Sequence, residues 1–242
     1  MKRPIEIVKE AQGTKFEDED GNVVELKLLP PLNSEEIKGL QSSIPCPIPD
    51  EVMELLLYCR GFEGILDWVD FSGTMGGYGG LEIFPHPVSI AHDGFGNFWI
   101  VDLTKDSKSW GPIFFACHDA PVIIFQTSSL SHFISEAIRL VTPPWESEIN
   151  DVHDKYHDRV WRENPRMLSY AQCVESGDQE LKEFAVSLGE SFLFIDMRNA
   201  KVGDGFSWGR YGPRTVTKRF KDKRIFAYEV QKSFWRRLFG NK

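Results

Sequence analysis

The sequence has little that would support a membrane protein, a metalloprotein or a redox enzyme. No apolar run approaches the roughly 20 residues that a transmembrane helix needs, and the N-terminus has no apolar core of signal-peptide length. The cysteines are few and none forms a CxxC pair. We therefore expect a cytoplasmic protein with reduced, buried thiols and with neither a metal nor a cofactor. The cysteines are Cys46, Cys59, Cys117 and Cys173.

Catalytic motifs are equally scarce. The glycine-rich segment 71–80 lacks a following Gly-Lys-Ser/Thr, so a surface loop is favoured over a phosphate-binding loop. His153 and His157 have the i,i+4 spacing of a helical metal pair. However, Asp154 stands where a metallopeptidase needs glutamate, and no third ligand is indicated. A solvated helix face is the favoured interpretation.

Two His-Asp pairs each follow a predicted strand and precede a turn, at His92-Asp93 and His118-Asp119. At one end of a shared sheet they could form a general-base pair or a metal site. Equally, aspartate stabilises turns by hydrogen bonding to nearby backbone. No serine, cysteine or lysine nucleophile has a recognisable setting around them. We therefore predict a protein without a catalytic centre and without a metal site.

Charge is distributed unevenly along the chain. Residues 1–142 carry 10 Lys or Arg against 21 Asp or Glu, whereas residues 198–242 carry 13 against 3. The two parts could attract each other, or each could meet a different partner. The basic part interleaves cations with aromatics, a pattern also found in nucleic-acid-binding proteins. These residues are Trp208, Arg210, Tyr211, Arg214, Lys218, Arg219, Phe220, Lys221, Lys223 and Arg224.

Hydrophobic periodicity and turn residues predict an α+β fold, with a twisted, mainly antiparallel sheet covered by helices. Residues 14–28 read as a hairpin, and Asn33 with Glu36 reads as a capping box at a helix start. Further helices are predicted at 50–59, 128–141, 149–161 and 179–188. Strands are predicted at 81–84, 88–91, 98–103, 113–117 and 122–126, and again at 191–197, 205–212, 214–220 and 224–230.

Two segments carry a family resemblance. IPDEVMELLLYCRG at 48–61 and AHDGFGNFWIVDL at 91–103, followed by a helix such as SSLSHFISEAIRL, resemble the SUKH superfamily in the order of their elements. That superfamily includes the fungal cell-wall-assembly regulator and bacterial proteins that neutralise toxins. The resemblance covers roughly residues 29–140. It implies a small α+β domain that binds another protein and catalyses nothing.

Thr142-Pro143-Pro144 is the best candidate domain boundary. We expect a SUKH-like domain with an N-terminal hairpin at 1–142, able to fold alone. A linker at 143–150 and a smaller α+β C-terminal appendage with a basic tail at 151–242 would follow.

The acidic front of the chain and the resemblance together predict an immunity-type protein that masks a basic toxin domain. A housekeeping scaffold or regulator of the cell-wall-assembly type is the first alternative. Nucleic-acid binding through the basic region is the second, opposed by the acidic front. The partner site is expected where the glycine-rich loop meets the Asp93–Asn97 turn, at Asp67, Asp70, Tyr78, Asp93 and Asp102.

Overall fold

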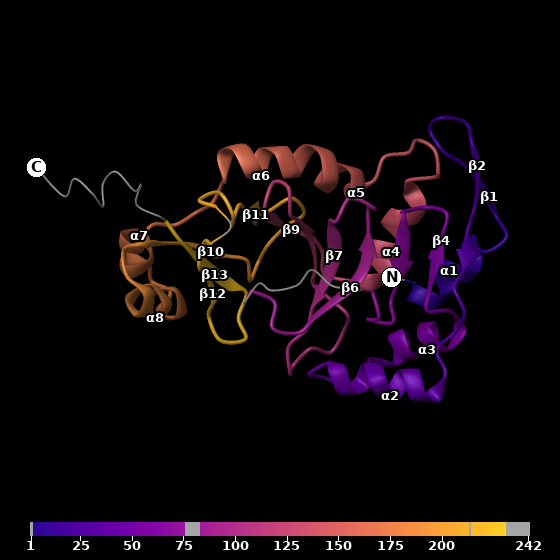
Figure 1. Cartoon of the computed structure of the whole chain (residues 1–242), viewed down its shortest axis with the longest axis horizontal. Helices are drawn as coiled ribbons and strands as arrows, with labels where there is room; N and C mark the ends of the chain where they lie inside the picture. Colours follow the sequence, from indigo (N-terminus) through magenta and orange to yellow (C-terminus); the bar gives the residue numbers. More distant parts are fainter. Residues whose placement is uncertain (1, 76–82, 213, 231–242) are drawn as a thin grey trace, which may run out of the picture.

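The computed structural model describes residues 2–75, 83–212 and 214–230 (Figure 1). Its N-terminal elements form a helix, a hairpin, a short strand and two further helices. In chain order they are α1 (Pro4–Ala11), β1 (Lys15–Glu17), β2 (Val23–Glu25), β3 (Lys27–Leu28), α2 (Ser34–Ser43) and α3 (Asp50–Tyr58). The predicted hairpin is confirmed, because β1 and β2 pair antiparallel with Phe16 opposite Val24.

The predicted capping box at the start of α2 is present. The Asn33 Oδ1 atom accepts hydrogen bonds from the backbone N–H groups of Glu35 and Glu36, at 2.9 and 3.0 Å. The Glu36 carboxylate accepts one in return from the Asn33 N–H group at 2.8 Å. These bonds satisfy amide groups that a helix start otherwise leaves unpaired.

An eight-stranded antiparallel sheet forms the centre of the molecule, in the order β11-β9-β8-β7-β6-β5-β4-β3. Four of the strands confirm sequence predictions: β6 (Pro87–His92), β7 (Phe98–Asp102), β8 (Ile113–Cys117) and β9 (Val122–Thr127). The other four are β3, β4 (Gly61–Glu63), β5 (Trp68–Asp70) and β11 (Gly205–Phe206). Of the strand predicted at 81–84, residues 81 and 82 lie outside the described residues, and residues 83 and 84 are not in a strand.

Helices cover one face of this sheet. Trp99 and Phe115 point into a core that also contains Leu55 of α3 and Phe133 of α4. The segment after residue 147 adds Val152 to the same core. The additional helical elements are α4 (Leu130–Arg139), α5 (Glu148–Asn150), the π-helical segment η1 (Asp151–Tyr156) and α6 (His157–Glu163). Within the described residues no helix is both long and apolar enough to cross a membrane.

A second, three-stranded sheet packs on the other face, in the order β10-β13-β12. Phe226 stacks on Phe206 of the central sheet with ring centroids 5.5 Å apart. On its far side, Phe194 contacts Phe184 at 5.6 Å between centroids, so α7 and α8 close this end of the molecule (Figure 1). The elements are α7 (Tyr170–Glu175), α8 (Gln179–Leu188), β10 (Phe192–Asp196), β12 (Thr217–Arg219) and β13 (Ile225–Glu229).

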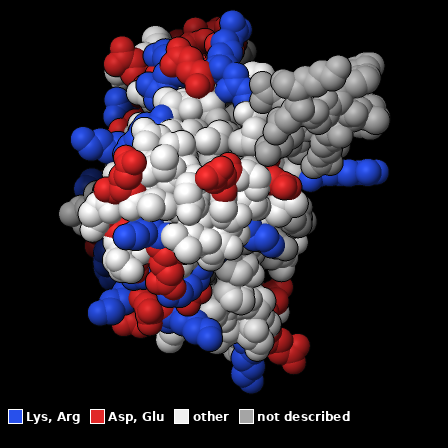
Figure 2. All heavy atoms as spheres, turned by 90° about the vertical axis from the view of Figure 1, so that its left-hand side faces the viewer, with Lys and Arg blue, Asp and Glu red and all other residues white. Residues whose placement is uncertain are grey.

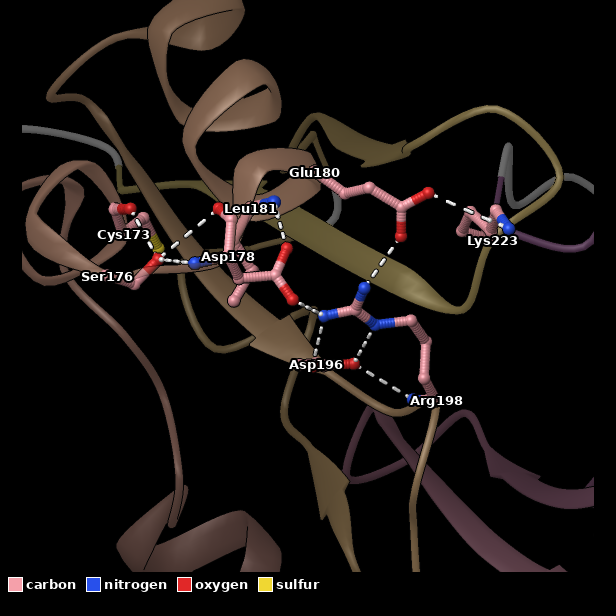
Figure 3. Close-up of polar contacts among 8 residues, drawn as sticks. All are labelled: Cys173, Ser176, Asp178, Glu180, Leu181, Asp196, Arg198 and Lys223. Atoms are coloured by element: carbon pink, nitrogen blue, oxygen red, sulfur yellow. Dashed lines mark hydrogen bonds and ion pairs between the residues drawn. The ribbon is translucent and has the colours of Figure 1, made fainter.

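Arg198 connects the three-stranded sheet to α8 through ion pairs (Figure 3). Its guanidinium donates to Asp196 at 2.9 and 2.7 Å, to Glu180 at 2.6 Å, and also to Asp178. Hydrogen bonds from its N–H groups to Asp196 raise the pKa of Arg198, although its partial burial opposes this. The three carboxylates occupy the planar donor set of the guanidinium, which is a structural role.

The α+β fold class is confirmed, but the expected boundary at residue 142 does not separate two packing units. Ile149 and Val160 belong to the same core as the helices of the first part, and β11 pairs with β9. The physical reason is that both faces of the central sheet are apolar: all five residues of β8 are buried. Such a sheet needs a layer on each side. The C-terminal region supplies the second layer.

Candidate functional site

A tight turn joins β6 to β7, and its two glycines are required by its shape. Gly94 and Gly96 have φ values of +76° and +89°, in the left-handed region that other residues rarely adopt. A Cβ atom on Gly94 would lie 3.1 Å from the Asp67 carboxyl carbon, and one on Gly96 would lie 2.8 Å from His118 Cε1. The turn is therefore held closely between Asp67 on one side and His118 on the other.

Asp93 holds the turn together from inside. Its Oδ1 atom accepts hydrogen bonds from the backbone N–H groups of Phe95 and Asn97, at 2.9 and 3.1 Å, and its Oδ2 atom accepts from Asn97 Nδ2 at 2.6 Å. The Asp93 side chain is only 9% exposed. Burial alone raises the pKa of Asp93, but these hydrogen bonds and one from His153 outweigh it and lower that pKa. Asp93 therefore stays ionised and shapes the loop.

Asn97 links the turn to the neighbouring loop. Its side-chain oxygen accepts from the backbone N–H group of His118 at 3.2 Å and lies 3.3 Å from His118 Nδ1. On the other side of that ring, His118 Nε2 lies 3.0 Å from a carboxylate oxygen of Asp119. The two His-Asp pairs predicted to share one end of the sheet are thus brought together by one amide side chain.

The η1 segment supplies a third side of the site. His153 Nε2 lies 3.2 Å from Asp93 Oδ2, and His153 Nδ1 lies 2.7 Å from Asp154 Oδ1. Burial lowers the pKa of His153, but hydrogen bonds to Asp154 and Asp93 more than offset this, and its pKa is raised overall. For His157, burial and the nearby charge of His153 both lower the pKa. Short π-helical segments often occur at functional positions.

Phe95 is the most exposed large apolar residue in the described part of the chain. It stands between the two glycines at the tip of the turn and is 78% exposed. Three exposed carboxylates surround the turn: Asp67 beside Gly94, Asp119 through His118, and Asp154 through His153. We call these four residues, Phe95, Asp67, Asp119 and Asp154, the β6–β7 tip. An exposed aromatic on a rigid turn within an acidic ring suits docking to a basic surface.

A cavity of about 320 Å³ lies beside the tip, lined in part by Asn97, Cys117, His153 and His157. Cys117 is buried, and burial raises the pKa of its thiol, which disfavours the nucleophilic thiolate. In the part of the chain that the structure describes, no three His, Cys, Asp or Glu side chains are placed to hold a metal ion. The hydrogen bonds of Asp93 and Asn97 order the loop.

The other expected partner-site residues lie elsewhere. Asp70 is buried, accepts a hydrogen bond from the Ser72 N–H group at 2.8 Å and lies 3.3 Å from Arg60 Nε. Asp102 is buried against Arg219. Tyr78 lies outside the described residues. Asp67 and Asp93 do come together at the turn, as expected. Phe95 was not among the expected residues, although its place between two glycines is a local signal of exposure.

Much of the basic region is engaged in internal contacts. Arg219 pairs with Asp102, Lys221 lies 3.0 Å from Glu183, and Phe220 is buried in the core under α8. Arg210 donates to a backbone carbonyl group. Figure 2 shows that acidic and basic side chains alternate on the end of the molecule that carries α7 and α8. A phosphate backbone requires a continuous basic stripe, so these contacts favour the structural interpretation.

Comparison with known families agrees with the order of these elements. Residues 31–136 match the SMI1 / KNR4 family (SUKH-1). The match confirms the resemblance over that segment, which contains α2, α3, the strands from β4 to β9 and the β6–β7 tip. A search of curated proteins gave no match, and a search of solved structures also gave none. Membership of this segment in the SUKH superfamily fits an immunity or a cell-wall-regulator role.

Proposed function

We propose that this protein is a non-catalytic binding module of the immunity type, which binds a basic bacterial toxin domain through the β6–β7 tip and neutralises it. The observation that carries the proposal is the exposure of Phe95 on a turn fixed by Asp93, within a ring of three carboxylates. The SUKH-1 match supports a protein partner. A regulator of cell-wall assembly is the alternative function within the same superfamily.

The tip combines two contributions to binding. An aromatic side chain buried at the centre of an interface commonly contributes 2 kcal/mol or more, which is about 30-fold in affinity. The carboxylates of Asp67, Asp119 and Asp154 would mainly accelerate association with a cationic partner. Because the turn is held by hydrogen bonds at both ends, little conformational entropy would be lost when the partner binds.

The partner can be identified with matched variants of the whole chain. Wild type, Phe95→Ala and Val23→Ala are each immobilised and used to capture proteins from the native host, followed by quantitative mass spectrometry. Val23 is also an exposed apolar residue, but it lies in the N-terminal hairpin. The proposal expects a protein with a basic toxin domain that wild type and Val23→Ala retain and Phe95→Ala loses. If all three variants retain the same partners, the tip is not the interface.

Association kinetics with the purified partner then test the acidic ring. Charge reversal at Asp67 and Asp119 should slow association at least tenfold at low salt and have little effect at high salt, where surface charges are screened. Asp20→Lys is the control for each single reversal, since Asp20 is exposed in the loop between β1 and β2. Asp93 is left unchanged because its carboxylate holds the turn. Equal slowing by Asp20→Lys would show that only net charge matters.

Neutralisation distinguishes the two superfamily roles. An immunity protein should abolish the toxicity of the captured domain when the two are co-expressed, and Phe95→Ala should not. Capture of a cell-wall synthesis protein without any toxic activity would instead support the regulator.

A further inference from the structure

A pocket of about 600 Å³ lies on the opposite side of the sheet from the β6–β7 tip's cavity, where the central and C-terminal layers meet. The 104–112 loop, the end of β9 and the segment before β13 line it. Its volume lies within the range of small-molecule sites. Its lining is rich in hydroxyl groups and cations, and includes Thr104, Ser109, Ser128, Arg198, Lys223 and Arg224.

Of the three cations, Arg198 is already engaged by three carboxylates. Its donors point to Asp196, Asp178 and Glu180 (Figure 3). Lys223 is exposed and lies 3.6 Å from a Glu180 oxygen, which is a weak surface pair (Figure 3). The partly buried positive charge of the pocket that lacks a paired carboxylate is therefore that of the third cation.

Arg224 has no such partner. It is partly buried at the start of β13, and its guanidinium makes no hydrogen bond or ion pair with the described part of the chain. Asp102 attracts it electrostatically, but Arg219 already occupies both Asp102 oxygens, at 2.6 and 3.0 Å. Burial lowers the pKa of Arg224, and the charge of Arg219 lowers it further. A desolvated cation without a counter-ion is costly.

Free hydroxyl groups accompany this guanidinium. Ser109 and Ser128 line the same pocket; both residues are exposed, and among the described residues their hydroxyl groups have no hydrogen-bond partner. Two carboxylates, Asp106 and Asp222, also line the pocket, but both residues are exposed, where solvent screens their charges. The pocket therefore offers one uncompensated guanidinium and hydroxyl donors from separate loops.

We propose that this pocket binds the phosphoryl group of a small polar molecule, with Arg224 as the charged donor and the hydroxyl groups of Ser109 and Ser128 as further donors. Donors on several chain segments suit a tetrahedral group with several acceptor oxygens, and the arginine fork matches two of them. The remaining volume accommodates the body of the molecule beside Phe125 and Met197. This site is independent of the β6–β7 tip and of the function proposed for it.

Isothermal titration with inorganic phosphate and with ribose 5-phosphate, at constant ionic strength, tests the site in the full chain. Both should bind wild type, and Arg224→Gln should weaken binding at least tenfold. Ser109→Glu should do the same, because it places a carboxylate in the pocket where the phosphoryl group is expected. Ser42→Glu is the matched control: it adds the same charge at an exposed position of α2 and should bind as wild type does.

Three results would overturn the proposal. The first is that wild type shows no binding of phosphate, and the second is that Ser109→Glu binds phosphate as tightly as wild type does. The third is equal binding of acetate and phosphate by wild type, which would mark a general anion site. If Arg224→Gln fails to fold, Ser109→Glu still decides, since its substitution lies at the surface.

Discussion

The ion pair between Asp102 and Arg219 joins the two sheets, and its removal should destabilise the whole molecule. Both side chains are almost fully buried, at 0% and 3% exposure. Two charge-assisted hydrogen bonds connect them, and Arg219 also donates to the carbonyl oxygens of Ile83 and Lys223, at 2.9 and 3.0 Å. Asp102→Asn removes the negative charge and leaves the guanidinium buried with neutral oxygen acceptors alone. We expect a loss of about 3–5 kcal/mol in the free energy of unfolding.

Urea unfolding followed by tryptophan fluorescence provides the measurement, because Trp99 and Trp110 are fully buried. Glu183→Gln is the control: its pair with Lys221 is exposed, and we expect a loss below about 1 kcal/mol. A double variant, Asp102→Leu with Arg219→Met, removes both charges and should recover most of the loss. If Asp102→Asn lowers the free energy of unfolding by less than about 1 kcal/mol, the buried ion pair does not hold the C-terminal layer on the central sheet, and the reasoning is refuted.

Three further predictions follow from the same contacts. Gly96→Ala should cost about 1–3 kcal/mol in urea unfolding, because φ is positive there and the new Cβ atom meets His118; a neutral effect would show that the loop is loose. His153 has a raised folded pKa, so its stabilisation is complete below an unfolded pKa of about 6.5 and is lost as the pH rises through the folded value. Between pH 5.5 and 8, wild type should therefore lose more stability than His153→Gln, and identical pH slopes would contradict this. A fragment of residues 1–142 should lack a cooperative thermal transition by circular dichroism, because it exposes the apolar face around Phe114; a sharp transition would mean that this layer is dispensable.

The sequence predicted well those helices, strands and turns whose signal lies within their own residues. The capping box of α2 and the glycine turn at Asp93–Asn97 with the strand-forming run after it depend on neighbouring residues alone, and both occur in the structure. The short strands β4 and β5 carry too few residues for a recognisable period. The layer arrangement depends on contacts distant in sequence, but the uninterrupted apolar run of β8 contained a sign that both its faces are covered.

The position of the candidate site could be predicted from the sequence only as far as the Asp93–Asn97 turn could be. The sequence places Asp93 in a turn, and its neighbour Asp67 was expected beside it. Whether a carboxylate is available to a partner depends on whether an arginine from elsewhere in the chain pairs with it. Nothing near Asp102 in the sequence indicates Arg219, 117 positions later. The same long-range pairing removes Arg219 from the basic surface that its neighbours in the sequence suggested.

The π-helical segment Asp151–Tyr156 holds one residue more in its turn than an α-helix would. Deletion of one residue here would leave a regular α turn and keep the residues on either side in phase. Ile149 and Val160, which flank the segment and share one core, would therefore still both face the sheet. The side chains within the turn would change direction, and His153 is one of them. A one-residue gap at this point in a related sequence would thus indicate a protein that keeps the fold and has lost the contact between His153 and Asp93.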